Sequence, residues 1–254
     1  MSKNTIIIGN WKMNPISLKE AEKLFVDIAK SVSRIKKTKI VICPPFLYLD
    51  KLKKIRTSKI QLGAQDLFWE DIGAYTGEVS GEMLYGIGVR YVIIGHSERR
   101  AQGENNEAIN KKIKSAIKSG LIPILCVGES KRGEEHSYFN FVKIQIEECL
   151  SGISKNSISK IIIAYEPIWA ISSTLNRKDA TVDDSREMAI FIRKVLFDKF
   201  GRESSLMKII YGGSANEKDA LDFLQNGGVD GLMPGRASLT AEKFIKMIEI
   251  AEKL

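Results

Sequence analysis

The decapeptide YVIIGHSERR, residues 91–100, holds the pattern on which the fold of this chain depends. Its first four residues form a continuous apolar run, whereas a strand with one face in water alternates apolar and polar side chains. A continuous run is typical of a parallel strand that is buried on both faces. After Gly95 and His96, the pair Ser97-Glu98 is typical of a helix start. The stretch therefore predicts a buried strand, a short turn and a helix.

The same order of apolar run and helical pattern recurs along the whole chain. Seven further runs are expected to form strands, at residues 5–8, 39–42, 59–62, 122–127, 161–164, 208–211 and, more weakly, 229–233. Eight parallel strands with crossover helices predict an α/β protein with one (β/α)8 barrel, a single domain over residues 1–254. The alternative is an open doubly wound sheet. No G-x-G-x-x-G motif follows an early strand, which disfavours the dinucleotide-binding form of that sheet.

Three of the connecting segments carry clear helical stripes of apolar residues. The stripes comprise positions 21, 24, 25, 28 and 32, then 109, 113, 116 and 117, then 189, 192, 193 and 196, of which 193 is an arginine. Ser17-x-x-Glu20 predicts a capping box at the start of the first helix. Gly120 predicts the end of the second helix.

Composition excludes several classes of protein. Apolar residues make up 44% of the 254 residues and charged residues 28%, which is globular composition. No apolar run reaches the ~18 residues of a membrane span, and the N-terminus lacks the pattern of a signal peptide. The three cysteines have no metal-binding spacing, so we expect no metal site and buried thiols in a cytoplasmic protein. The net charge of +8 is concentrated before residue 60, but no aromatic residues interleave these lysines, which disfavours nucleic-acid binding.

Three side chains that could carry chemistry follow strand ends, where barrel enzymes place their active sites. Lys12, after the first run, would be a surface lysine, an anion-binding group or a Schiff-base former. His96 precedes a helix N-terminus, which disfavours imidazolium, so it would be either a neutral imidazole that donates a hydrogen bond or a packed polar histidine at a strand end. Glu166 is the only carboxylate within an apolar stretch and is a candidate general base. The alternative for Glu166 is a structural ion pair with Lys12 or Arg99.

Two glycine-containing turns follow the last two strands. They are YGGS at residues 211–214 and PGRAS at residues 234–238, each before a helical segment. Backbone N–H groups in such turns bind anions, and the loops after strands 7 and 8 of a barrel frequently bind phosphate. These turns therefore predict a phosphate site.

Taken together, these segments resemble the triosephosphate isomerase family. The resemblance runs in family order through GNWKMN (9–14), GAQD (63–66), GAYTGEVS (73–80), YVIIGHSERR (91–100), AYEPIWAI (164–171), YGGS (211–214) and the ASL of GRASL (235–239). It implies a TIM-barrel isomerase of glycolysis and gluconeogenesis that interconverts dihydroxyacetone phosphate and D-glyceraldehyde 3-phosphate through an enediolate, without metal or cofactor.

The resemblance also implies roles for individual residues. Glu166 would move the proton, His96 polarise the carbonyl, Lys12 supply positive charge and Asn10 orient the substrate. The remaining implied residues are Ser172, Ser214, Gly235 and Arg236, whose backbone N–H groups would hold the phosphate, and Ser97, Glu98, Thr76 and Tyr211 in supporting positions. Of these, Glu98 would support Lys12. The 71–80 loop would reach into a second copy, with Thr76 near Asn10 of the partner subunit, which implies a homodimer.

Two segments depart from the family pattern. The lid sequence WAIGTGKTA is replaced by WAISSTLNRKDA at residues 169–180, which lacks both glycines and is longer. Because Thr174 is β-branched, we expect lid closure to use a different hinge or to be slower, with a methylglyoxal by-product or a turnover that is sensitive to viscosity. Arg236 replaces the second glycine of a Val-Gly-Gly sequence. If that glycine has a positive φ, the arginine is strained by ~1–2 kcal/mol.

These departures leave other functions open. A four-carbon ketose phosphate isomerase is one alternative, because both segments border the far end of the substrate. A non-catalytic phosphate-binding barrel and a Schiff-base enzyme that uses Lys12 are the others.

Overall fold

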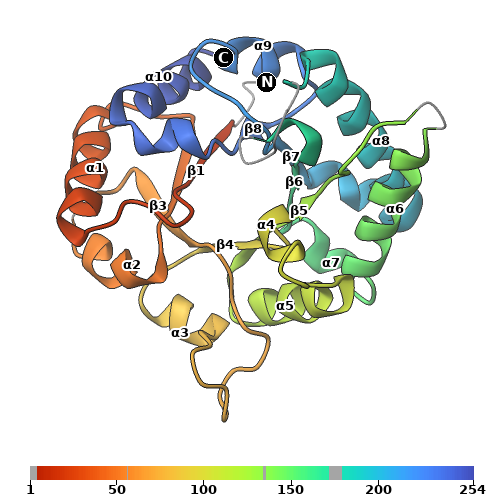
Figure 1. Ribbon diagram of the computed structural model, residues 1–254, viewed down its shortest axis with the longest axis horizontal. Helices are drawn as coiled ribbons and strands as arrows, with labels where there is room; N and C mark the ends of the chain where they lie inside the picture. The colour runs from red at the N-terminus through yellow and green to blue at the C-terminus, as the bar shows by residue number, and fades with distance from the viewer. Residues whose placement is uncertain (1–4, 56, 134–135, 172–178) are drawn as a thin grey trace.

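The computed structural model describes residues 5–55, 57–133, 136–171 and 179–254. Eight parallel strands form a closed barrel in sequence order, and helices surround it (Figure 1). The strands are β1 (Ile6–Asn10), β2 (Lys39–Cys43), β3 (Ile60–Ala64), β4 (Tyr91–Ile94), β5 (Ile122–Val127), β6 (Ile162–Tyr165), β7 (Lys208–Tyr211) and β8 (Gly231–Leu232). The barrel prediction is confirmed, and the open-sheet alternative is wrong.

Ten α-helices and three 3₁₀ turns connect the strands within the described ranges. The helices are α1 (Leu18–Ser31), α2 (Phe46–Lys53), α3 (Gly81–Gly86), α4 (Ser97–Arg100), α5 (Asn106–Lys118), α6 (Ser137–Cys149), α7 (Lys155–Ile158), α8 (Val182–Phe200), α9 (Ala220–Asn226) and α10 (Ala241–Glu252). The 3₁₀ turns are η1 (Ile168–Ala170), η2 (Gly201–Leu206) and η3 (Arg236–Leu239).

The packing of β1 explains why its apolar run is continuous. Ile6 and Ile8 belong to the cluster of strand side chains that fills the inside of the barrel. Ile7, which points the opposite way along the pleat, belongs to the layer between the barrel and the helices. Both faces of the strand are therefore buried, as the sequence pattern predicts.

The predicted helix signals are largely present. The Ser17 hydroxyl accepts a hydrogen bond from Glu20 N–H at 3.3 Å and so caps α1. The reciprocal capping box is found instead at α8, between Thr181 and Asp184. Gly120 follows α5 with a φ of +80°, a left-handed conformation that suits glycine.

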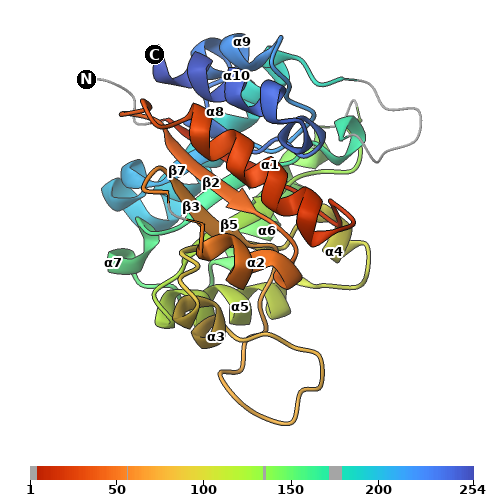
Figure 2. The same ribbon diagram turned by 90° about the vertical axis from the view of Figure 1, so that its left-hand side faces the viewer.

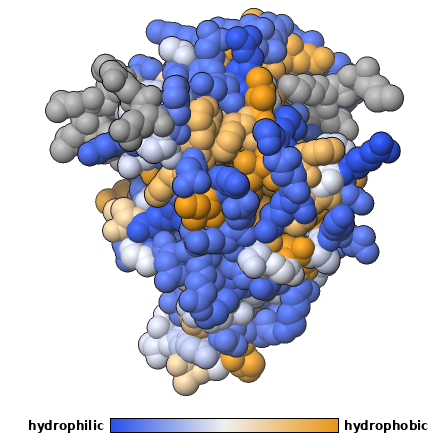
Figure 3. Space-filling view, turned by 90° about the vertical axis from the view of Figure 1, so that its right-hand side faces the viewer, coloured by the Kyte–Doolittle hydropathy of each residue, from blue (hydrophilic) through white to orange (hydrophobic). Residues whose placement is uncertain are grey.

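The surface of the molecule is mixed in polarity. On the face that carries α6 and α8, apolar surface lies among polar side chains (Figure 3). Phe141 of α6 and Ile190 of α8 are exposed. The segment between β3 and α3 protrudes from the body of the barrel (Figure 2). Among the described residues, no helix has the length and apolar character needed to span a membrane.

Candidate active site

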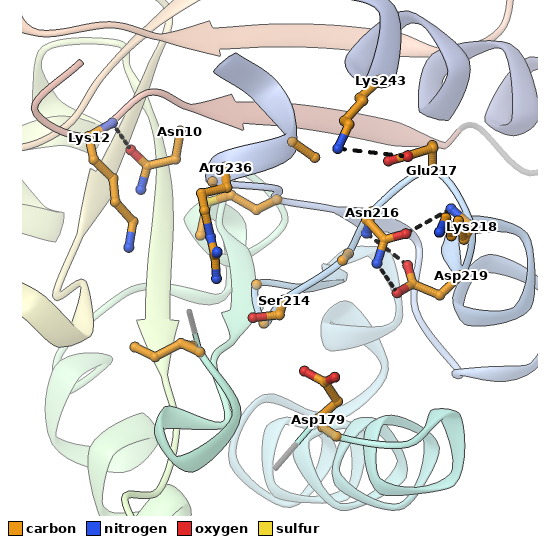
Figure 4. A pocket seen from close by; sticks show the side chains of 18 of the residues that line it. Asn10, Lys12, Asp179, Ser214, Asn216, Glu217, Lys218, Asp219, Arg236 and Lys243 are labelled. Carbon is orange, nitrogen blue, oxygen red and sulfur yellow. Dashed lines mark hydrogen bonds and ion pairs between the residues drawn. The ribbon is translucent and has the colours of Figure 1, made fainter. Parts of the chain in front are cut away.

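A cavity of about 520 Å³ opens at the carboxyl ends of the strands, where the sequence places the site. Of the expected site residues, six line it (Figure 4): Asn10, Lys12, His96, Ser214, Gly235 and Arg236. They come from the ends of β1, β4, β7 and β8, so barrel closure gathers them from both halves of the chain. Ser172 lies outside the described residues.

Lys12 has an unusual backbone that orients its side chain. Its φ is +51°, a left-handed conformation that costs a residue other than glycine ~1–2 kcal/mol. Two hydrogen bonds hold this conformation, because Lys12 N–H donates to Asn10 Oδ1 at 3.0 Å and Gln65 Nε2 donates to the Lys12 carbonyl at 2.8 Å. The Lys12 ammonium lies 2.6 Å from Glu98 Oε1. The turn after β1 is therefore built to fix a positive charge.

Gln65 is a site-positioning residue that sequence reasoning missed. Its amide also donates to the Cys43 carbonyl at 2.9 Å, so it joins the ends of β1 and β2. The only sequence signal for it is the GAQD segment, which by itself indicates no role.

His96 stands at the start of α4 with its tautomer set by the backbone. Its Nδ1 accepts a hydrogen bond from Glu98 N–H at 3.2 Å. An Nδ1 that accepts carries no proton, so the proton of a neutral ring is on Nε2. Nε2 lies 3.3 Å from Glu166 Oε1. The imidazole can thus present an N–H donor to the cavity that it lines.

Glu166, directly after β6, is only 2% exposed. Its Oε2 accepts a hydrogen bond from Ser97 N–H at 3.1 Å, and its side chain is not among those that line the cavity. The alternative of an ion pair with Lys12 or Arg99 is wrong, because Lys12 contacts Glu98 and Arg99 contacts Asp66 at 2.7 Å.

Close packing at the end of β5 positions the Glu166 backbone. Glu166 N–H donates to the Val127 carbonyl at 2.8 Å. A Cβ on Gly128 would lie 1.9 Å from the Glu166 carbonyl oxygen, so only glycine permits this approach.

The turns after β7 and β8 form one end of the cavity. The Ser214 hydroxyl donates to the Ala170 carbonyl at 3.0 Å, and Gly235 precedes η3 with a φ of −87°. Among the described residues other than glycine, only Lys12 and His136 have a positive φ. The condition for strain at Arg236, a positive φ, is therefore not met, since its backbone is in an ordinary conformation. The expectation for the altered lid concerns residues 172–178, which lie outside the described part of the chain.

Tyr211 and Thr76 occupy very different surroundings. Tyr211 is buried and stacks on Phe223 with ring centroids 4.2 Å apart, and burial raises the pKa of its hydroxyl. A Cβ on Gly213 would lie 2.3 Å from the Tyr211 hydroxyl oxygen, so the ring packs against the turn that carries Ser214. Thr76 is exposed on the protruding segment before α3 and does not line the cavity.

A buried carboxylate, which sequence reasoning also missed, ties η1 to the barrel. Glu129 Oε1 accepts hydrogen bonds from Tyr165 Oη at 2.8 Å and Trp169 Nε1 at 2.9 Å, and it contacts Arg132 Nε at 3.0 Å. Burial, and then the charge of Glu129, raises the pKa of Tyr165, so its hydroxyl stays a donor. Arg132 extends the network to Asp184 of α8 at 2.6 Å. The network anchors the turn that precedes residue 172.

No group of three or more His, Cys, Asp or Glu side chains in the described ranges is arranged to hold a metal ion. The groups gathered at this end of the barrel are a fixed lysine, a histidine N–H donor and a buried carboxylate, beside two glycine-containing turns. Fold and cavity together define a barrel enzyme of the class that acts on small anionic substrates at its strand ends.

Within that class, the chain belongs to the triosephosphate isomerase family. The family described as "Triosephosphate isomerase" matches residues 5–251. A triosephosphate isomerase of Thermoanaerobacter pseudethanolicus is 44% identical over 250 residues, which are 97% of this chain and 99% of that protein. One of Dehalococcoides mccartyi is 45% identical over 249 residues, or 96% of each chain. The crystal structure of triosephosphate isomerase from Bartonella henselae has a TM-score of 0.85 and 32% identity, and covers 97% of this chain and 98% of its own.

The chain is thus an isomerase that interconverts dihydroxyacetone phosphate and D-glyceraldehyde 3-phosphate, a reaction of glycolysis. These matches favour the three-carbon substrate over the four-carbon alternative and the isomerase over a non-catalytic barrel.

Proposed function

We propose that Glu166, His96, Lys12 and Asn10 carry out this isomerisation. Glu166 removes a proton from one carbon of the bound triose phosphate and returns it to the neighbouring carbon. His96 Nε2–H and the Lys12 ammonium stabilise the negative oxygen of the enediolate, and Asn10 orients the substrate. The observation that carries the proposal is the 3.3 Å separation of His96 Nε2 and Glu166 Oε1 at the edge of a cavity that Lys12 also lines.

In this mechanism the Glu166 carboxylate moves between two positions. In the structure it is held by Ser97 N–H and does not line the cavity. A general base must come within hydrogen-bond reach of the proton that it removes. Substrate binding therefore releases the carboxylate from Ser97 and turns it toward the substrate carbon.

The phosphate group occupies the end of the cavity formed by the two glycine-containing turns. Backbone N–H groups of Ser214, Gly235 and Arg236 donate to its oxygens, and Ser172 adds a donor according to the family resemblance. Ser214 and Gly235 line this end of the cavity, which supports the assignment.

The active form is a homodimer that assembles through the 71–80 loop. Three apolar side chains in the loops after β1, β2 and β3 are largely exposed: Met13 (93%), Leu47 (84%) and Ile72 (88%). The three strands are neighbours in the barrel, so their loops emerge side by side and present an apolar surface to a second copy. Thr76 would then lie near Asn10 of the partner subunit.

Sedimentation velocity tests the dimer. Ile72→Asp should shift the protein to monomers, whereas Ile190→Asp, at an exposed position on α8, should leave the dimer intact. A monomeric native protein contradicts the proposal.

We place the enzyme in the cytoplasm. Cys43, Cys126 and Cys149 are all free and buried, which supports a reducing compartment. Western blotting of cytoplasmic, membrane and secreted fractions tests the location.

A coupled assay with D-glyceraldehyde 3-phosphate tests the function, with a four-carbon ketose phosphate as the second substrate. Turnover of the triose phosphate should greatly exceed that of the longer substrate. In parallel, borohydride in the presence of dihydroxyacetone phosphate should leave Lys12 unmodified. A reduced adduct on Lys12 would contradict the isomerase mechanism and indicate a Schiff-base intermediate.

A further inference from the structure

The side chain of Arg236 lies in the cavity, in addition to any role of its backbone. Arg236 follows β8 as the first residue of η3, and it is an exposed residue that lines the cavity. In Figure 4 its guanidinium extends in the same direction as the Lys12 side chain, and Ser214 lies beyond it on the other side. The guanidinium is thus directed at the phosphate end of the proposed site.

The turn that carries Arg236 is firmly held. Ser238, which is fully buried, donates its hydroxyl proton to the Gly235 carbonyl at 2.6 Å, and its backbone N–H donates to the same oxygen at 3.0 Å. A Cβ on Gly235 would lie 3.4 Å from Lys12 Cε, so the turn packs directly against the Lys12 side chain. Arg236 therefore projects from a rigid base that is fixed relative to Lys12.

Arg236 differs from two of the lysines that line the cavity in having no carboxylate partner among the described residues. Lys12 has a carboxylate partner in Glu98 at 2.6 Å, and Lys243 has one in Glu217 at 4.0 Å. Within the described ranges, no carboxylate oxygen lies within 4.0 Å of the Arg236 guanidinium. Lys218 also lacks such a partner, but in Figure 4 it extends on the far side of Asn216.

We propose that the Arg236 guanidinium binds the phosphate dianion of the substrate directly. A guanidinium matches phosphate oxygens with two parallel N–H donors and remains charged at every physiological pH. Glu98 pairs with Lys12, whereas no carboxylate of the described residues pairs with Arg236, so the guanidinium has its donors available for the phosphate oxygens. The inference rests on the proposed function in that the ligand is the phosphate group of a triose phosphate.

Isothermal titration calorimetry with inorganic phosphate tests this without any turnover. Arg236→Gly and Arg236→Gln should each weaken phosphate binding roughly tenfold, because each removes charge-assisted hydrogen bonds. Arg236→Lys, which keeps the charge but loses the two-pronged geometry, should give an intermediate affinity. Lys218→Met is the matched control, since it removes another unpaired cation of the same cavity, and its affinity should stay within twofold of wild type.

Three outcomes overturn the proposal. The first is an unchanged phosphate affinity in both Arg236→Gly and Arg236→Gln. The second is a loss of phosphate affinity in Lys218→Met equal to that in the Arg236 variants, which would indicate only a general effect of positive charge. The third is wild-type phosphate affinity in Arg236→Gln alone. Circular dichroism checks that each variant is folded. Should wild type bind phosphate through Arg236 yet fail the coupled assay, the proposed function would be wrong and this inference would stand.

The kinetic signature separates binding from chemistry. The loss of kcat/KM in Arg236→Gln should come mainly from a higher KM for D-glyceraldehyde 3-phosphate and less from a lower kcat. The KM of Arg236→Lys should lie between those of Arg236→Gln and wild type. A loss confined to kcat would contradict a role in phosphate binding.

Discussion

Ser97 N–H and Glu166 Oε2 are joined by a 3.1 Å hydrogen bond that directs the buried carboxylate toward the start of α4. The second oxygen, Oε1, has no hydrogen-bond partner among the described residues and lies 3.3 Å from His96 Nε2. An unsatisfied buried carboxylate oxygen is costly, so the resting position is one that the carboxylate can leave when substrate arrives. The reach of this side chain is therefore decisive for the reaction.

Glu166→Asp should cut turnover about 10²-fold while the protein stays folded. The shorter side chain withdraws the carboxylate by roughly 1 Å, and a misplacement of that size is enough for such a loss. The coupled assay gives kcat, and thermal unfolding checks the fold. Glu147→Asp, the same shortening on a partly exposed position of α6, should retain wild-type turnover. Near wild-type turnover in Glu166→Asp would remove Glu166 from the role of base.

Lys12→Met should weaken substrate binding and chemistry together. The ammonium is proposed to face both the phosphate and the enediolate oxygen, and loss of a charged partner in a closed site costs about 2–5 kcal/mol. The measurements are kcat/KM and the inhibition constant of inorganic phosphate. Lys54→Met, which removes an exposed ion pair with Asp50, is the control. The electrostatic role is wrong if phosphate inhibits Lys12→Met and wild type equally.

Gln65 should prove important because it holds the left-handed backbone of Lys12. Gln65→Met keeps the volume but removes both donors, and we expect kcat/KM to fall about tenfold as Lys12 is displaced. Gln65→Glu should lower kcat/KM further, since it turns carboxylate oxygens toward the carbonyl oxygens of Lys12 and Cys43. The two variants separate positioning from packing, because a purely structural role would alter the melting temperature of both without lowering kcat/KM of folded enzyme.

Lys112→Met should destabilise the fold strongly at neutral pH. Lys112 is buried and contacts Asp66 at 2.7 Å and Glu104 more closely still. Removal of the cation leaves Asp66 and Glu104 with Arg99 as the one cation near them among the described residues, at 2.7 and 3.5 Å. Loss of one partner of a buried ion pair costs about 3–5 kcal/mol, and the remaining Arg99 contacts place the expected cost at the lower end of that range. Urea unfolding gives the free energy, with Lys111→Met, an exposed cation on the same helix, as the control.

The loss of folding stability in Lys112→Met should be smaller at lower pH. Burial raises the pKa of Asp66, and Lys112 counteracts that rise, so the variant should raise this pKa further. A carboxyl whose pKa is higher in the folded state favours folding when protonated, and this advantage is lost as pH rises through the folded pKa. The stability difference between variant and wild type should therefore narrow as pH falls from 7 toward 5. A difference that is constant or grows over this range contradicts the argument.

The sequence by itself determined the barrel and the positions of the chemistry. Continuous apolar runs such as residues 91–94 are local signals, because burial on both faces of a strand leaves no polar position along it. The groups after those runs, including Lys12 and His96, were predictable for the same reason, since parallel strands all present their carboxyl ends to one side.

Tertiary structure alone decided how those groups are held. Gln65 and Lys12 are 53 residues apart and Ser97 and Glu166 are 69 apart, and only barrel closure brings each pair within hydrogen-bond distance. The backbone at Arg236 is a further case, because the sequence leaves open whether this position has a positive φ and the structure shows that it does not. Sequence periodicity reports which face of an element is buried. It carries no information on which distant donor meets which acceptor, because that depends on the register and packing of all eight strands.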